Sequence, residues 1–155
     1  MDTMQGAVII GGQRQVELKE FPVPEPGPGQ VLIRVRAAGM CGSDLHNIYR
    51  TMNLDEPGHY QGCIAGHEPS GTVEAVGPDC KRGFKKGDRV IVYHICGCGH
   101  CNSCRKGWIV NCTSDERSVY GWHRDGAYAD FMLTEEYTLL ELPDELSFVD
   151  GAIIS

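Results

Sequence analysis

Residues 66–77 read GHEPSGTVEAVG, a strand-like segment that begins with two potential metal ligands. Polar and apolar residues alternate over 70–76, which is typical of a β-strand with one buried face. His67 and Glu68 come just before this strand, and Gly71 and Gly77 follow at fixed intervals. Imidazole and carboxylate are both zinc ligands, although a single histidine is more often a structural residue. The segment therefore predicts a strand with candidate ligands at its start.

The flanking segments repeat the strand pattern between turn signals. We predict further strands over 15–20, 30–38, 88–93, 127–134 and 137–142, the last two forming a hairpin. Short strands at this spacing predict a mainly β fold, either a barrel or a sandwich.

Helical periodicity is scarce along the chain. One short helix is predicted over 43–49, with Ser43 as its N-cap. A second is predicted over 148–154, with Ser147 as its N-cap. No Gly-x-Gly-x-x-Gly follows a strand, so the sequence lacks the dinucleotide-binding fingerprint.

Composition excludes several classes of protein. The chain has 155 residues, the size of one domain and too few for two full α/β lobes. A net charge of −7 without a basic stripe argues against nucleic-acid binding, and the basic cluster at 81–86 is interpreted as a solvated turn. Apolar runs of about four residues are far too short for a membrane span. Because the N-terminus shows no signal-peptide pattern, we expect a cytoplasmic protein.

Half of the eight cysteines follow the spacing Cys-x2-Cys-x2-Cys-x7-Cys, and they are Cys98, Cys101, Cys104 and Cys112. Two-residue gaps let a tight loop direct successive thiolates to one point, and four thiolates make a closed, structural zinc site. Disulfides, free thiols and an iron–sulfur cluster are the alternatives. The remaining cysteines away from the ligand set, Cys63, Cys80 and Cys96, are interpreted as ordinary small buried residues.

A second group of polar residues follows the strand at 30–38. Residues 39–46 read GMCGSDLH, in which Cys41 is a suitable zinc ligand. Alone, Cys41 is more simply explained as a core residue. Its combination with His67 and Glu68 makes a second metal site the better interpretation.

With these motifs the chain resembles the zinc-dependent medium-chain alcohol dehydrogenases, specifically their N-terminal catalytic domain. The resemblance runs from the proline-rich turn at 22–29 through residues 66–77 and the four-cysteine segment to residues 125–130, which read DGAYAD. It implies a GroES-like, partly open β-barrel with a few short helices and a zinc-binding lobe. The CGSD form around Cys41 looks most like the polyol and threonine dehydrogenase branch.

The resemblance also implies roles for individual residues. Cys41 and His67 would bind a catalytic zinc, with Glu68 as an occasional or alternative ligand. Ser43 would hydrogen-bond the substrate hydroxyl, His46 would carry the proton on to solvent, and Asp44 would orient the ring of His67. Simpler explanations are a helix N-cap for Ser43, a first-turn acid for Asp44 and an exposed helix position for His46.

For the whole protein, the resemblance implies oxidation of a small alcohol or polyol with NAD or NADP, and a homo-oligomer. We expect residues 1–155 to form one GroES-like domain, with 148–155 beginning the connection to a nucleotide-binding Rossmann domain outside this sequence. A third catalytic ligand would then lie just beyond Ser155, and the chain alone would have no turnover. Candidate pocket walls are Tyr49, Leu54, Tyr93 and His94. The alternative is a stand-alone GroES-like zinc module with a structural or partner-binding role.

Overall fold

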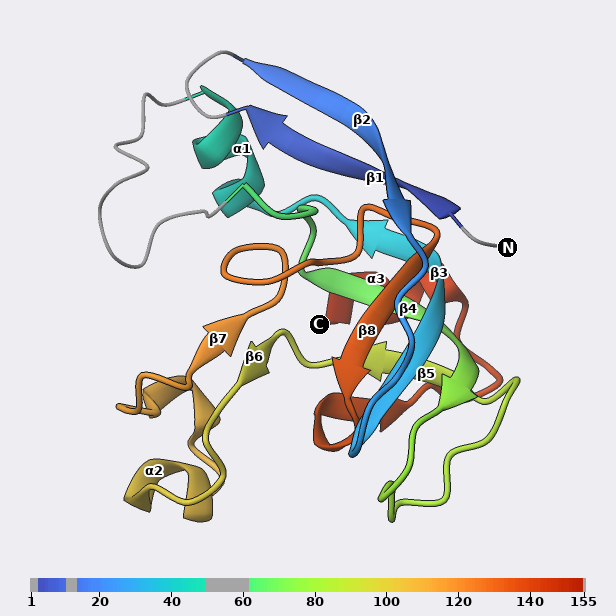
Figure 1. Cartoon of the computed structure of the whole chain (residues 1–155), viewed down its shortest axis with the longest axis vertical. Coiled ribbons are helices and arrows are strands. Elements are labelled where there is room, and N and C mark those ends of the chain that lie inside the picture. The colour runs from blue at the N-terminus through green and yellow to red at the C-terminus, as the bar shows by residue number, and fades with distance from the viewer. Residues whose placement is uncertain (1–2, 11–13, 50–61, 155) are drawn as a thin grey trace.

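The computed structural model of the chain describes residues 3–10, 14–49 and 62–154. The strands are β1 (Thr3–Ile10), β2 (Gln15–Pro22), β3 (Gln30–Gly39), β4 (Glu68–Val76), β5 (Arg89–Val92), β6 (Ile95–Cys96), β7 (Ser118–Val119), β8 (Phe131–Glu135) and β9 (Leu139–Glu141). The helices are α1 (Gly42–Tyr49), α2 (Asn102–Arg105) and α3 (Phe148–Ile154), with the 3-10 turns η1 (Ile109–Asn111) and η2 (Glu136–Thr138). Figure 1 shows their arrangement.

An antiparallel sheet in the order β8-β3-β4-β5-β9 forms the centre of the molecule. Its β-branched residues supply the core, and Val31, Ile33, Val73, Val90 and Val92 are all buried. The two edge strands do not pair with each other among the described residues, so the sheet is not closed. The mainly β, partly open architecture with a few short helices agrees with the prediction.

The predicted hairpin of residues 127–134 and 137–142 is wrong. β8 pairs with β3 and β9 pairs with β5, so these neighbours in sequence lie on opposite edges of the sheet. The 3-10 turn η2 between them is held by Glu136, whose carboxylate accepts hydrogen bonds from the amides of Lys81 (2.8 Å) and Arg82 (2.7 Å). This anchored turn carries the chain across the sheet instead of reversing it.

Two smaller pairs of strands flank the central sheet (Figure 1). β1 and β2 form a hairpin that is joined to the rest through backbone hydrogen bonds from Ala7 to Tyr128 (2.7 Å) and from Ala65 to Ala7 (2.9 Å). β6 and β7 form a short ladder from which residues 97–117 project as a separate lobe containing α2 and η1. In the described part of the chain, no helix has the length and apolar character needed to span a membrane.

The cap predicted for the C-terminal helix is confirmed. The hydroxyl of Ser147 accepts a hydrogen bond from the amide of Asp150 (3.1 Å), and the carboxylate of Asp150 accepts one from the amide of Ser147 (2.9 Å). This reciprocal pair is a capping box, which satisfies two backbone donors at the start of α3. α3 packs on the sheet through buried Gly151 and Ala152.

Candidate metal centres

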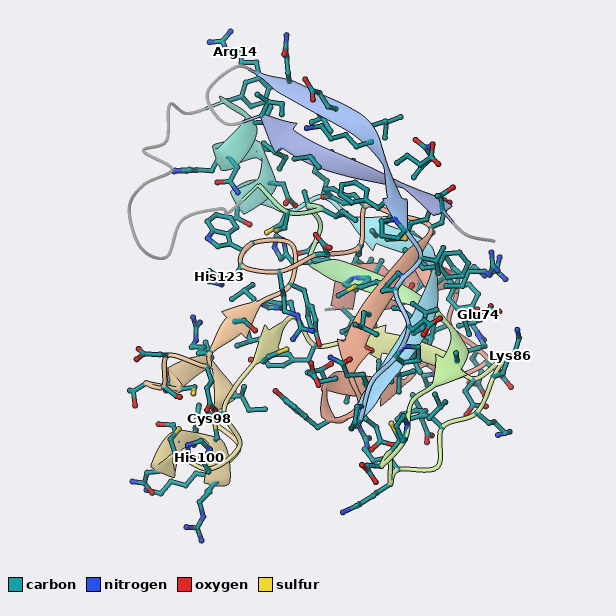
Figure 2. All side chains as sticks on the ribbon, in the orientation of Figure 1. Arg14, Glu74, Lys86, Cys98, His100 and His123 are labelled. Carbon is teal, nitrogen blue, oxygen red and sulfur yellow. The ribbon has the colours of Figure 1, made fainter. Side chains whose placement is uncertain are left out.

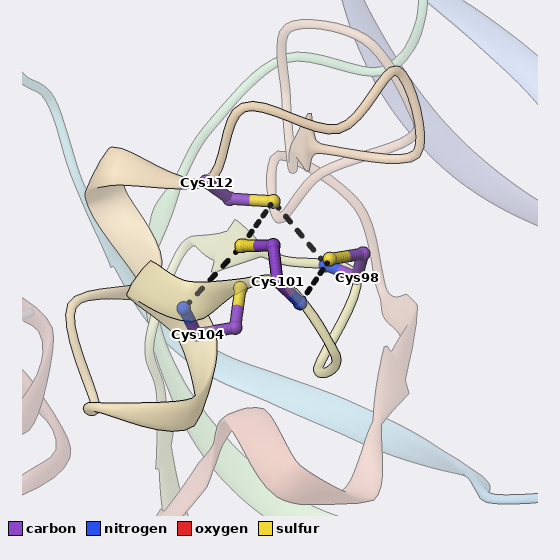
Figure 3. A group of neighbouring side chains, drawn as sticks. All are labelled: Cys98, Cys101, Cys104 and Cys112. Carbon is purple, nitrogen blue, oxygen red and sulfur yellow. Dashed lines mark hydrogen bonds between the residues drawn. The ribbon is translucent and has the colours of Figure 1, made fainter.

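The four cysteines predicted to bind zinc meet in the lobe below β6 and β7. The sulfur atoms of Cys98, Cys101, Cys104 and Cys112 all lie within 4.8 Å of one another (Figure 3). None of the eight cysteines forms a disulfide. Cys101 precedes α2 and Cys104 lies within it, so one short helical turn directs two sulfurs inward.

The backbone around two of these sulfurs, those of Cys101 and Cys112, favours the ionised form, whereas burial raises the pKa of Cys104 to about 12. Hydrogen bonds run from the amide of Cys101 to the sulfur of Cys98 (3.3 Å) and from the amide of Cys104 to the sulfur of Cys101 (3.4 Å). The amide of Cys104 is the main reason that the pKa of Cys101 falls to about 6, and the amide of Cys98 lowers the pKa of Cys112. Thiolate is the form of cysteine that binds metal. The donor set therefore fits a four-coordinate zinc.

The second group of ligands is assembled by the register between β3 and β4. Gly39, the last residue of β3, is paired with Glu68, the first residue of β4. Cys41, two residues beyond β3, is thereby brought beside His67, one residue before β4. Their ligand atoms and the Glu68 carboxylate lie within 4.8 Å of one another. Sulfur, nitrogen and oxygen at one point are a donor set that zinc accepts.

Close backbone packing helps to fix His67. Gly66, the residue before it, has φ of +90°, a conformation that favours glycine. A Cβ atom at Gly126 would lie 2.0 Å from the carbonyl oxygen of Gly66, and one at Gly121 would lie 2.3 Å from it. Only glycine allows the segment after β7 to approach the ligand-bearing segment this closely.

α1 places two further predicted site residues next to His67. The helix begins at Gly42, and the amide of Cys41 donates to the Asp44 carboxylate (2.9 Å). Ser43 is therefore not the N-cap as predicted, because the helix already includes it. Its hydroxyl instead lies 3.2 Å from Nε2 of His67.

Asp44 is almost fully buried, 1% exposed, behind the ring of His67. Its Oδ1 lies 3.5 Å from Nδ1 of His67, in ion-pair contact but outside hydrogen-bond geometry. The Tyr128 hydroxyl lies 2.9 Å from Oδ2. Contact with Asp44 is the largest cause that raises the pKa of His67, to about 9, while the Ser43 hydroxyl lowers the pKa of Cys41.

An open cavity of about 280 Å³ lies beside these ligands. Its lining residues come from α1, from the ends of β4, β6 and β7, and from the following loop: Ser43, His67, His94, Arg117, Val119, Trp122 and His123. His94 lines it as expected, with its ring 5.6 Å from that of His67. Burial lowers the pKa of His94.

Other residues considered for the site lie elsewhere. Tyr93 contacts the ring of His94 but does not line the cavity. His46 and Tyr49 are exposed on α1. Leu54 lies outside the described residues.

Sequence reasoning missed Arg117, Trp122 and His123. They belong to a turn-rich segment without a local motif, and they reach the cavity through the pairing of β6 with β7.

Known proteins share both sequence and fold with this chain. Residues 27–144 match the family described as the alcohol dehydrogenase GroES-like domain. The chain is 49% identical over 159 residues to an uncharacterized zinc-type alcohol dehydrogenase-like protein, YphC, of Escherichia coli K12, covering 100% of the chain and 44% of that relative. It is 33% identical to sorbitol dehydrogenase of Bacillus subtilis, covering 96% of the chain and 41% of that relative.

Solved structures of related enzymes also match nearly the whole chain. Acetophenone reductase from Geotrichum candidum, in complex with NAD, matches with a TM-score of 0.86 at 30% identity, over 99% of this chain and 44% of that one. A cobalt- and zinc-bound alcohol dehydrogenase from Pyrobaculum aerophilum matches with a TM-score of 0.82 at 30% identity, over 97% of this chain and 44% of that one. The chain thus spans less than half the length of the proteins it matches.

Proposed function

Because the chain belongs to the alcohol dehydrogenase GroES-like domain family, we propose that it is the zinc-binding catalytic domain of an alcohol or polyol dehydrogenase. In the whole protein, an alcohol would be oxidised to a carbonyl compound with NAD or NADP as the hydride acceptor. Relatives include a sorbitol dehydrogenase and a zinc-type alcohol dehydrogenase-like protein, and neighbours carry NAD or zinc. Their similarity over nearly the whole chain favours this function over that of a stand-alone zinc module.

The convergence of Cys41, His67 and Glu68 beside a cavity is the observation that carries the proposal. His67 lines the cavity, so its ligand group and a small molecule can meet there. Zinc, when bound, supplies a Lewis acid that lowers the pKa of an alcohol hydroxyl. The four-cysteine site would hold a second zinc with no open position, which serves the lobe's structure.

Ser43 is the residue best placed to handle the substrate proton. Its hydroxyl lines the cavity and lies 3.2 Å from His67. A hydroxyl both accepts and donates, so Ser43 would take the alcohol proton at Oγ and release its own. His46 is three positions further along α1, on the same helix face, and is exposed, so it would pass the proton to solvent.

Asp44 would contribute to the reaction through its contact with His67 and not through contact with the substrate. A buried carboxylate 3.5 Å from Nδ1 restricts the orientation of the ring, and so directs the opposite nitrogen towards Ser43 and the cavity. Asp44 is therefore a positioning residue in this proposal.

The domain proposal extends to the whole protein. Residues 1–155 would form the GroES-like catalytic domain, with 148–155 leading to a nucleotide-binding domain and a third zinc ligand beyond Ser155. We propose that the chain alone has no turnover, because the acceptor-binding part is separate, and that the whole protein is a homo-oligomer.

Metal analysis of purified variants tests both zinc sites. We expect about two zinc ions per chain. Cys98→Ser should lose the tightly held ion, and Cys41→Ala should lose the weakly held one. Cys80→Ala is the matched control, because Cys80 lies in neither group, and it should keep both. A Cys41→Ala protein that retains the full zinc content would contradict the catalytic site, and unchanged zinc in folded Cys98→Ser would contradict the structural one.

A further inference from the structure

Arg117 differs from the other half-buried arginines of the described chain. Arg34 pairs with Glu74 (3.3 Å), Arg89 with Asp144 (3.2 Å) and Arg124 with Glu135 (2.9 Å). The side chain of Arg117 makes no ion pair with any described residue, and its Nε is buried without a hydrogen-bond partner there. Withdrawing a guanidinium N–H from water without an acceptor is unfavourable. A ligand bound in the cavity would supply the missing acceptor.

The fold directs this arginine at the cavity. Arg117 comes just before β7, and β7 pairs with β6, next to His94. A backbone hydrogen bond from Tyr120 to His94 (3.0 Å) continues this pairing. Arg117 and Val119 are two residues apart in extended chain, so they share a face, and both line the cavity. The pairing of the two following residues and the hydrogen bond from the Arg117 amide to Ser114 (3.0 Å) thus hold the backbone of Arg117 at the cavity wall.

The guanidinium of Arg117 brings a permanent positive charge to the cavity although the chain as a whole is acidic. The cavity lining includes one guanidinium and three imidazoles, those of His67, His94 and His123, and no described acidic side chain. Glu68 lies with the metal ligands, outside that lining. Figure 2 shows His123 on the loop after β7, far from the Glu74–Lys86 ion pair across the view. The net charge of −7 comes from other surfaces.

We propose that Arg117 binds an oxyanion on the alcohol substrate, so that the substrate class is a small hydroxy acid or phosphorylated alcohol. This inference rests on the proposed function. The hydroxyl end would lie at Ser43 and His67, and the carboxylate or phosphate at the far wall of the cavity. A guanidinium offers parallel N–H donors that match two oxygens of either group. Arg117 is therefore the residue that determines specificity.

Binding to the zinc-loaded chain tests this, with matched pairs of probes followed by NMR. Lactate is compared with propylene glycol, and glycerol phosphate with glycerol, because each pair differs in the anionic group. We expect at least one anion to bind about ten- to a hundredfold more tightly than its neutral partner. The Arg117 Nε–H signal should shift with that anion, and signals of Ser43 and His67 should shift with both members. The two pairs separate carboxylate from phosphate recognition.

Variants distinguish binding of the anion by Arg117 from binding of the anion by the zinc ion. Arg117→Gln should abolish the preference, and Arg117→Lys should keep part of it. Arg105→Gln is the control, since it removes the same charge from an exposed position on α2, and its preference should be unchanged. Equal binding of anionic and neutral probes, with Ser43 and His67 still responding, overturns the inference and leaves the proposed function standing. A preference retained in Arg117→Gln also overturns it. If neither class shifts Ser43 or His67, both proposals fail.

Discussion

A single buried carboxylate, Asp44, links the start of α1 to the candidate catalytic ligands. Burial alone would raise its pKa, but contact with His67, the Cys41 amide and the Tyr128 hydroxyl together lower it. The carboxylate therefore stays ionised near neutral pH. One side chain both caps the segment that carries Cys41 and contacts the ring of His67.

Replacing Asp44 by asparagine tests this link through pH. The folded pKa of His67 is about 9 and its ordinary value is 6.5, so protonation of His67 favours the folded state. That contribution is complete below pH 6.5 and is lost as the pH rises through about 9. In protein freed of weakly held metal, Asp44→Asn should lower the pKa of His67 towards its ordinary value, as read from the histidine ring signals. The destabilisation relative to wild type should be about 1–3 kcal/mol at pH 6 and smaller at pH 9.

Asp150→Asn is the matched control for this measurement. Asp150 caps α3 and is only partly buried, and no histidine is among its described partners. Its effect on stability should be the same at both pH values. A His67 pKa that is unchanged in Asp44→Asn would show that Asp44 does not act on the ring.

Individual site residues could be predicted from the sequence where several side chains of one ligand type stand at short, regular spacing. Cys98, Cys101, Cys104 and Cys112 are close in sequence, and a short loop brings them together. Arg117 had no such signal, because His94, which lines the same cavity, lies 23 positions earlier and the two come together only in the folded chain.

Among the strands and helices, the pairing of β3 with β4 determines where the candidate ligands Cys41, His67 and Glu68 lie. Gly71 of β4 sits opposite Val35 of β3, and a Cβ atom added there would lie 2.2 Å from the carbonyl oxygen of Arg34. The two backbones are therefore packed closer than any side chain permits. This close approach lies in the same strand pair that aligns Gly39 with Glu68.

Gly71→Ala should consequently destabilise the domain, because backbone must move to accommodate the methyl group. We expect a loss of about 2–4 kcal/mol in the free energy of unfolding, measured with urea. Gly42→Ala is the control, since nothing lies within 4 Å of the added Cβ and alanine suits a helix. Its stability should be equal to wild type or slightly higher. Comparable stability of the two variants would argue against the close approach of the β3 and β4 backbones at Gly71.

Strand positions were predictable from alternation, but strand partners were not. Residues 127–134 and 137–142 are separated by two residues and are locally indistinguishable from a hairpin. The decisive contacts come from Lys81 and Arg82, more than fifty residues away, which bind Glu136 and hold η2. Long-range anchoring of this kind leaves no local pattern.

In the whole molecule, stability is divided unevenly between sheet and lobe. The central sheet contains most of the fully buried valines and isoleucines, whereas α2 and η1 contribute no buried residue. We therefore expect a lobe with so little apolar burial to depend on bound zinc for its folding. The GroES-like fold could be predicted from the sequence, because the sequence motifs that carry the resemblance lie both in the central sheet and in the lobe.

Removing zinc with a strong chelator should therefore unfold the lobe and spare the sheet. We expect hydrogen exchange over 97–117 to accelerate at least a hundredfold (about 3 kcal/mol), with β3 and β4 still protected. Cys98→Ser should show the same pattern without chelator, and Cys80→Ala should not. A lobe that stays protected after complete loss of zinc would show that its fold does not need the metal.

The sheet order has a consequence for how the chain folds. β3 pairs with β4 after a moderate stretch of chain, but its other edge waits for β8, and Gln30 meets Glu135 across 105 positions. Closing so long a loop is entropically costly, so this pairing should form late and slowly. During synthesis at ordinary speed, the N–H and C=O groups on this edge of β3 would stay unpaired for about 5–20 s. That interval is when the nascent chain is most exposed to aggregation, and when a chaperone would have most to protect.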